Sequence, residues 1–130
     1  MLEVWISRDC LNTLLFIARS AHPNETFLLL RGEIRRGVVI VRELLFPPPT
    51  YTSSSSIAIN PLRLPVDFSI IGVAHSHPSG ALRPSITDLT SKFGAILVII
   101  AYPYDSELCV AAYEFSGKRL RLRILESCNS

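Results

Sequence analysis

The chain has 130 residues, a formal net charge of +2 and 48% hydrophobic residues. This length suits one domain with a single substantial core, and the apolar composition excludes an intrinsically disordered chain. The small charge gives no sign of nucleic-acid binding, and the absence of a long apolar stretch or a leader segment predicts a soluble, cytoplasmic protein that does not contact membranes.

Three cysteines, Cys10, Cys109 and Cys128, are widely spaced and form no C-x-x-C pair. An odd number of such cysteines indicates neither a disulfide framework nor a second metal site. We expect Cys10 and Cys109 to be small core residues.

The N-terminal third predicts a strand, a helix and a hairpin. Apolar residues alternate over residues 2–7, as in a strand with one buried face, and recur at helical spacing over residues 8–21. The helix should stop at His22, because the residue before a proline is pushed out of the helical region. A histidine at that place is typical of a cap or the surface rather than of a metal site. Residues 26–34 and 38–46 predict a hairpin whose first strand is central.

Residues 47–56 are the one segment of low complexity, with three prolines near the start and a run of serines at the end. Proline stiffens a chain and serine loosens it, so we expect a loop within one domain that spans residues 1–130, not a linker between two domains. Residues 57–59 predict a short strand.

The most informative stretch is His75-Ser76-His77-Pro78, which follows a mostly apolar run at residues 68–74. Such a run is typical of a buried strand. Residues two apart in a strand point to the same side, so His75 and His77 share a face while Ser76 points away. Pro78 ends the strand, because it lacks the N–H that a continuing ladder needs.

Seven residues after Pro78, Ser85 has the features of a helix N-cap, and Asp88 falls in the first helical turn. There the carboxylate lies at the positive end of a helix dipole. Two imidazoles and one carboxylate are the ligand set of a catalytic zinc ion that keeps its fourth position for water. The pattern therefore predicts one zinc ion per chain, bound by His75, His77 and Asp88.

Each half of this pattern also has a purely structural interpretation. Two histidines at a strand end can be hydrogen-bonded surface groups, since short motifs often match by chance. Ser85 and Asp88 can be only a capping box. The conjunction of an apolar strand, two histidines, a proline stop and a capped acid favours the metal site.

The C-terminal part predicts a helix over residues 85–93 that ends at Gly94, a central strand over residues 95–101, and a hairpin made of residues 108–115 and 120–125. Arginines alternate with apolar residues in the last strand. This favours a half-buried edge strand, although a basic stripe for an acidic partner gives the same pattern. The elements indicate an α/β fold with a mixed, mainly antiparallel sheet flanked by helices, and periodicity leaves the strand order open.

The spacing of His75-Ser76-His77-Pro78, Ser85 and Asp88 resembles the signature of the JAMM (MPN+) metalloprotease family, and every motif position is filled. The resemblance covers nearly the whole chain. It implies a cytidine-deaminase-like MPN fold and a single JAMM domain of the small prokaryotic or archaeal type. That family includes zinc isopeptidases that remove ubiquitin and ubiquitin-like modifiers, and relatives that process prokaryotic ubiquitin-like sulfur carriers.

The resemblance also implies catalytic roles. Glu25 matches the glutamate that the family uses at the start of an upstream strand, and the chemistry agrees, because a metal-bound water needs a proton acceptor that is not itself a ligand. Taken alone, Glu25 is an ordinary exposed loop acid, and that alternative stays open. Ser85 matches the residue that donates a hydrogen bond to the developing oxyanion.

In relatives, the segment before the histidine strand can add a strand that pairs with the substrate tail. We therefore expect residues near Tyr51, Ser55, Ser56 and Ile57 to bind an extended C-terminal peptide by β-augmentation. A passive solvated loop is the alternative.

The resemblance implies a zinc-dependent (iso)peptidase, similar to deubiquitinases and desampylases, that cleaves the bond after the C-terminus of a ubiquitin-like modifier. That modifier or its protein conjugates are the expected partners. Processing of a ubiquitin-like sulfur carrier is an alternative with the same chemistry. A non-catalytic MPN scaffold is a further alternative, but it predicts a damaged motif, whereas this one is intact. The pattern leaves the oligomeric state open.

Overall fold

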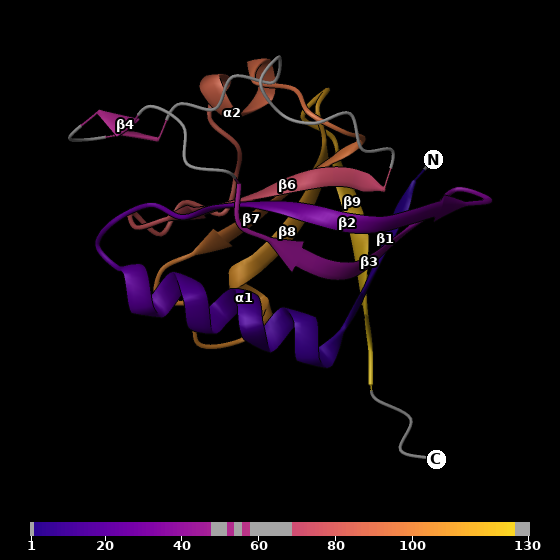
Figure 1. The fold of residues 1–130 in the computed structure, drawn as a ribbon, viewed down its shortest axis with the longest axis horizontal. Coiled ribbons are helices and arrows are strands. Elements are labelled where there is room, and N and C mark those ends of the chain that lie inside the picture. Colours follow the sequence, from indigo (N-terminus) through magenta and orange to yellow (C-terminus); the bar gives the residue numbers. More distant parts are fainter. Residues whose placement is uncertain (1, 48–51, 54–55, 58–68, 127–130) are drawn as a thin grey trace.

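The computed structural model describes residues 2–47, 52–53, 56–57 and 69–126, and Figure 1 shows the path of the chain. The N-terminal half contains β1 (Glu3–Ser7), α1 (Arg8–Ala21), β2 (Phe27–Arg35), β3 (Val38–Leu45), β4 (Thr52–Ser53) and β5 (Ser56–Ile57). The C-terminal half contains β6 (Ile70–His77), α2 (Ile86–Thr90), β7 (Ile96–Ala101), a short 3-10 helix (Glu107–Cys109), β8 (Val110–Glu114) and β9 (Arg119–Leu125). None of the described helices is long and apolar enough to cross a membrane.

Seven of these strands close into a barrel in the order β1-β3-β2-β6-β7-β8-β9, and β1 pairs with both β3 and β9. The pairs β2–β3, β2–β6, β7–β8 and β8–β9 are antiparallel, whereas β1 runs parallel to both neighbours and β6 runs parallel to β7. The predicted α/β fold with a mixed, mainly antiparallel sheet is confirmed. The predicted edge position of the last strand is wrong, because β1 pairs along one side of β9 and closes the barrel.

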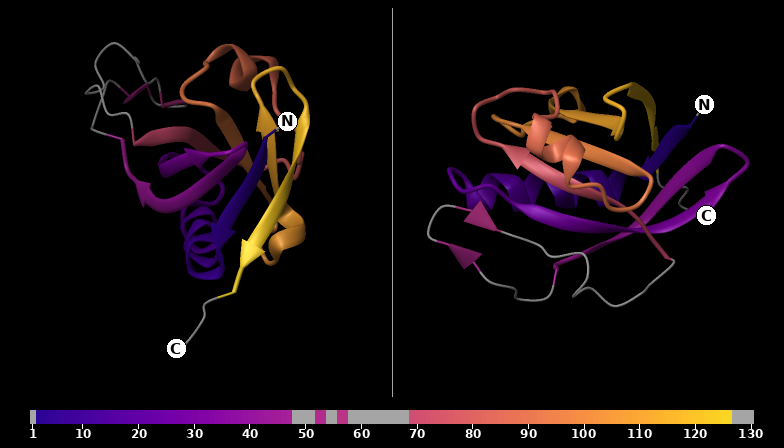
Figure 2. Two further views of the ribbon diagram at one scale, coloured as in Figure 1. Left: turned by 90° about the vertical axis from the view of Figure 1, so that its right-hand side faces the viewer. Right: turned by 90° about the horizontal axis from the view of Figure 1, so that it is seen from above.

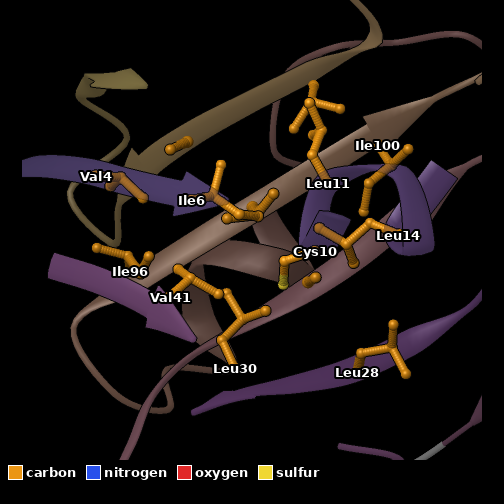
Figure 3. Packing of buried hydrophobic residues seen from close by; sticks show 14 of the residues in the cluster. Val4, Ile6, Cys10, Leu11, Leu14, Leu28, Leu30, Val41, Ile96 and Ile100 are labelled. Carbon is orange, nitrogen blue, oxygen red and sulfur yellow. The ribbon is translucent and has the colours of Figure 1, made fainter. Parts of the chain in front are cut away.

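Helix α1 lies along one face of the curved sheet, and α2 lies on the opposite side (Figure 1, Figure 2). Ser7 caps α1 by accepting a hydrogen bond from the Cys10 N–H at 3.1 Å. The apolar stripe of the helix packs on inward-facing side chains of the barrel strands, and together they form the main core (Figure 3). The buried residues of the helix are Cys10, Leu11, Leu14, Leu15 and Ala18. Their spacing is the one that predicted this helix.

A second, smaller core lies on the other face of β2, β6, β7 and β8. Its buried members are Leu29, Val73, Leu97, Ile99, Ala111 and Tyr113. Leu82 and Leu89, from the segment around α2, pack against it. Side chains alternate along a strand, so His75 and His77 stand on the same face of β6 as Val73. The two histidines therefore continue this second core to the end of β6.

The helix after the histidine strand is shorter than predicted. It ends at Thr90 with Ser91 as its C-cap, not at residue 93. Gly94 does not end the helix; it adopts φ = 78° beside β6, where a Cβ atom would lie 2.6 Å from the Gly72 nitrogen. The glycine is therefore required by a left-handed backbone and by the close approach of β6.

The cysteine predictions hold only in part. Cys10 is buried, and burial raises the pKa of its thiol to about 11. Cys109 is half-buried, and its thiol donates to Asp105 Oδ1 at 3.4 Å, so its predicted core position is wrong. Cys128 lies outside the described residues.

We expect Gly32→Ala to destabilise the fold. The register between β2 and β3 shifts at Gly32, and a Cβ atom there would lie 1.7 Å from the carbonyl oxygen of Ile40. The two strands must separate to admit a methyl group, so the free energy of unfolding should fall by at least about 2 kcal/mol. Urea unfolding of both proteins measures this, and an unchanged transition midpoint would contradict the close approach.

Candidate metal centre

The end of β6 presents two histidines on one face and a serine on the other. His75 pairs with Phe27 of β2 and with Ile99 of β7, so its backbone is held from both sides. The Phe27 ring meets the His75 ring edge to face, with 4.7 Å between centroids. Ser76 points to the α1 side and is buried. The alternation predicted for His75-Ser76-His77 therefore describes the structure.

Helix α2 brings Asp88 to these histidines. Ser85 is its N-cap, and the two residues form a complete capping box: Asp88 N–H donates to Ser85 Oγ at 3.1 Å, and Ser85 N–H donates to Asp88 Oδ2 at 2.9 Å. A helix of five residues is not stable alone. The loop before it is held in addition by Tyr113, whose hydroxyl donates to the Leu82 carbonyl at 2.5 Å.

The three predicted ligands converge. His77 Nε2 lies 3.0 Å from Asp88 Oδ2, and His75 Nδ1 lies 3.9 Å from Asp88 Oδ1. Asp88 is buried, with only 8% of its surface exposed, although a buried carboxylate is costly unless it is paired. The structural interpretation of Ser85 and Asp88 as a capping box is therefore correct but incomplete, because the same carboxylate faces both histidines.

Hydrogen bonding orients the His77 ring for metal binding. His77 Nδ1 lies 2.8 Å from the carbonyl oxygen of Ala81, which can only accept, so Nδ1 carries a proton. In the neutral ring, the lone pair is then on Nε2 and points at Asp88 Oδ2. Two acceptors at that distance require a cation between them, either a proton or a metal ion. This arrangement of a second hydrogen bond is the usual support of a metal-binding histidine.

His75 has an unused nitrogen. Of the buried side-chain nitrogen and oxygen atoms in the described part of the chain, His75 Nε2 is the one without a hydrogen-bond partner. An unsatisfied buried polar atom costs about 1–3 kcal/mol. A metal ligand explains why such an atom is retained in the site.

The electrostatics of the site favour binding of a cation. Burial alone would raise the pKa of Asp88, but the hydrogen bonds from His77 and from the Ser85 N–H outweigh it and lower that pKa to about 2. The hydrogen bond to Asp88 raises the pKa of His77 in spite of partial burial. Desolvation lowers the pKa of His75, so its imidazole is neutral and available as a ligand.

The donor set fits a zinc ion after small movements. Two ligands bound tetrahedrally to zinc at about 2.0–2.2 Å are about 3.4 Å apart, and the 3.0 Å between His77 Nε2 and Asp88 Oδ2 is slightly shorter than this value. Among the residues that the structure describes, no three His, Cys, Asp or Glu side chains form a closed metal cluster. His77 Nε2 and Asp88 Oδ2 must separate slightly to admit an ion.

Glu25 lies beside the metal centre in the loop between α1 and β2, with an exposed side chain. The antiparallel register pairs Phe27 with His75, and the Ser76 N–H still donates to the Thr26 carbonyl, so the next residue, Glu25, leaves the sheet close to His77. The proximity is also electrostatic, because Glu25 contributes to the raised pKa of His77. Among the residues that the structure describes, no hydrogen bond or ion pair joins Glu25 to the three ligands, which suits a proton acceptor that is not itself a ligand.

Ser85 is exposed at the start of α2. Its Oγ accepts the Asp88 N–H, so the hydroxyl keeps its own proton for donation. The cap and the predicted oxyanion interaction are therefore compatible at one hydroxyl.

The substrate-binding prediction falls mostly outside the described residues. Tyr51 and Ser55 are not described, whereas Ser56 and Ile57 form β5, which pairs with β4 as a separate two-stranded sheet. The proposed pairing with a peptide stays a prediction.

Sequence reasoning missed two contacts beside Glu25. Thr26 is bonded to the buried hydroxyl of Ser76. His22, the C-cap of α1, stacks on Tyr102 with 4.7 Å between centroids, and its Nδ1 lies 3.0 Å from the Tyr104 hydroxyl. His22 is therefore a structural residue, as expected. The position of Ser76 between the two histidines was the available signal for the first contact; no local pattern indicates the second.

Comparison with known proteins identifies similar chains. Residues 7–114 match the family described as prokaryotic homologs of the JAB domain. A probable metalloprotease of Haloferax volcanii is 36% identical in an alignment 131 residues long, and this alignment covers 95% of this chain and 81% of that protein.

Solved structures give the same result. A structure described as a JAMM metalloprotease-like zinc site in the proteasome and signalosome is 33% identical, with a TM-score of 0.70, over 97% of this chain and 100% of that one. A JAB1/MPN domain protein from Archaeoglobus fulgidus is also 33% identical, with a TM-score of 0.68, over 95% of this chain and 98% of that one.

We expect the purified protein to bind one zinc ion, and His75→Ala and His77→Ala each to abolish tight binding. His22→Ala is the matched control, because His22 is the third histidine of the chain and lies against Tyr104 instead. Zinc content by mass spectrometry of the native protein measures the stoichiometry. Full zinc content in His77→Ala, or loss of zinc in His22→Ala, would contradict the ligand assignment.

We expect zinc affinity to fall as the pH falls. The raised pKa of His77 means that its ring keeps a proton to higher pH than an ordinary histidine, and zinc must displace that proton. The lowered pKa values of His75 and Asp88 mean that these ligands cost no proton near neutrality. Below the pKa of His77, affinity should fall about tenfold per pH unit. Competition with a chromophoric chelator between pH 5.5 and 8 measures this, and a flat profile would contradict it.

Proposed function

This chain belongs to the family of prokaryotic homologs of the JAB domain, and from that premise we propose that it is a zinc-dependent peptidase that cleaves the bond after the C-terminus of a ubiquitin-like modifier. The observation that carries the proposal is the convergence of His75, His77 and Asp88, with Glu25 near enough to His77 to contribute to its raised pKa. Similarity to a probable metalloprotease of Haloferax volcanii supports the reaction class.

His75, His77 and Asp88 would hold a zinc ion, which would act as a Lewis acid and lower the pKa of a bound water to about 7. Glu25 accepts the proton of the attacking water and delivers it to the nitrogen of the leaving amine. The Ser85 hydroxyl donates to the oxyanion that develops on the scissile carbonyl; removal of one such donor typically costs about 10²–10³ in rate. The Ala81 carbonyl holds the His77 ring, so that Nε2 faces the site throughout.

The mechanism uses no thiol nucleophile. Cys10 is buried on the core-facing side of α1, and burial raises the pKa of its thiol to about 11, so the reactive thiolate is scarce at neutral pH. Cys109 lies on the 3-10 helix before β8, and its thiol donates to Asp105 Oδ1 at 3.4 Å. An inhibitor that alkylates cysteines should therefore leave cleavage intact.

For the substrate, we propose an extended C-terminal tail that pairs with the segment containing Tyr51, Ser55, Ser56 and Ile57 by β-augmentation. A linear peptide bond, as in a sulfur-carrier precursor, and an isopeptide bond to a lysine present the same scissile amide. The choice between them is left to the assay. A non-catalytic scaffold is disfavoured, because a scaffold needs neither the convergent ligands nor an acid opposite them.

The test is cleavage of two probes: ubiquitin with a short C-terminal peptide extension, and ubiquitin joined to a lysine side chain by an isopeptide bond. We expect cleavage of at least one probe, loss of cleavage on chelation and recovery when zinc is returned. Glu25→Gln should lower kcat by about 10²–10⁴ while one zinc stays bound, because the variant loses the proton acceptor and no ligand.

Glu43→Gln is the matched control, because Glu43 is an exposed acid on β3 with the same change of charge. It should cleave like the wild type. Cleavage that persists without metal would sink the mechanism. Wild-type kcat in Glu25→Gln would leave the metal site in place but remove Glu25 from it.

A further inference from the structure

Buried polar residues are rare in the part of the chain that the structure describes. Ser76 and Asp88 are the two that are buried, and Asp88 belongs to the metal centre. Ser76 is only 1% exposed and lies on the opposite face of β6 from the histidines, among apolar residues. A hydroxyl in that environment costs free energy unless it is hydrogen-bonded, and an alanine would pack there without that cost. The hydroxyl therefore needs an explanation.

The hydroxyl of Ser76 is used by one residue, Thr26. Its Oγ accepts from the Thr26 N–H at 2.7 Å and from the Thr26 hydroxyl at 2.7 Å. The Ser76 N–H in turn donates to the Thr26 carbonyl at 3.1 Å. All three polar groups of Thr26 are therefore bonded to Ser76.

One of these bonds takes the place of a backbone hydrogen bond of the regular antiparallel pairing. At the hydrogen-bonded positions of an antiparallel pair, two directly opposite residues exchange both backbone N–H···O bonds. Thr26 and Ser76 make one of them, but the Thr26 N–H turns to the serine hydroxyl instead of the serine carbonyl. The regular pairing of β2 with β6 begins only at the next residue, Phe27. A side-chain acceptor thus extends the pairing at the point where the chain leaves the sheet.

The residue before this point is Glu25. The peptide bond between Glu25 and Thr26 contains the N–H that Ser76 holds, and that bond is planar. That plane also contains the Cα atom of Glu25, so the bond to Ser76 restrains the point from which the Glu25 side chain leaves the backbone. On the other side of the loop, His22 is anchored to the Tyr104 hydroxyl at 3.0 Å. Without the Ser76 hydroxyl, the Thr26 N–H, which belongs to the peptide bond that follows Glu25, would lose its acceptor.

We propose that Ser76 is a positioning residue for Glu25, which it holds through Thr26 without contacting the substrate. The inference rests on the proposed role of Glu25 as the proton acceptor. The serine between the two histidines then positions the acid that precedes the neighbouring strand β2. One strand end, His75-Ser76-His77, therefore provides two metal ligands and also positions the proton acceptor. Displacement of a catalytic group by about 1 Å can cost about 10² in rate.

The test compares Ser76→Ala with the wild type by three measurements. Hydrogen exchange of the Thr26 amide in the metal-free protein should become about tenfold faster. In the zinc-loaded protein, kcat on the ubiquitin probes should fall about 10–100-fold, while KM changes less than about threefold and zinc content stays at one. Ser76→Thr keeps the hydroxyl and should recover most of the lost kcat.

Ser7→Ala is the matched control. It also removes a serine hydroxyl that accepts one backbone N–H, that of Cys10, and it lies at the end of α1 remote from Glu25. It should speed exchange of the Cys10 amide and leave kcat unchanged. Where Ser76→Ala does not fold, Thr26→Val carries the test, because it removes the hydroxyl bond alone and should lower kcat several-fold.

Three outcomes would overturn the inference. An unchanged kcat in Ser76→Ala with a faster Thr26 amide would show that the bond does not position Glu25. Loss of zinc in parallel with activity would show that Ser76 acts on the histidines. An equal fall of kcat in Ser7→Ala would reduce the effect to general stability. Absence of cleavage by the wild type, in contrast, would remove the proposed function itself.

Discussion

The antiparallel pairing of β2 with β6 sets the positions of the two histidines and of Glu25 relative to one another. It places Phe27 opposite His75, and Glu25, two residues before Phe27, lies near His77. Side chains alternate along β6, so the two imidazoles share one face while Ser76 and its bonds to Thr26 lie on the other. A shift of the register by one residue would turn Glu25 away from the histidines and bury them in the main core.

The third ligand, Asp88, lies on a short helix that several contacts hold in place. Helix α2 has five residues and depends on its capping box, on Leu89 against the second core and on the Tyr113 hydroxyl bonded to Leu82. Asp88 takes part in the cap and in the metal centre at once. A hydrogen bond with His77 and one from the Ser85 N–H lower its pKa to about 2, so the carboxylate is ionised wherever a zinc ligand is needed. Stability of the helix and the charge of the site are therefore coupled through one side chain.

Closure of the sheet explains where the sequence pattern misleads. Alternating arginines in residues 119–125 resemble an exposed edge, yet β1 runs parallel to this strand and completes the barrel. Alternation with a period of two indicates which face of a strand is exposed to solvent, but it does not indicate which strands pair with its two edges. The end of α2 is likewise not predictable from the local sequence. Residues 91–93 are compatible with a helix, but they connect Thr90 to Gly94, which lies against β6.

The amino-acid sequence alone determined the elements and the ligand types. Helix α1, the buried strand before His75 and the capped acid at Asp88 depend on residues a few positions apart, and local spacing is what a sequence records. Tertiary structure alone decided which groups meet. Glu25 reaches His77, and Thr26 reaches Ser76, across 50 or more residues through the β2–β6 register, and the carboxylate of Asp88 reaches both histidines only because α2 folds back over the second core. These long-range contacts depend on the total packing of the barrel, which no single stretch of the chain specifies.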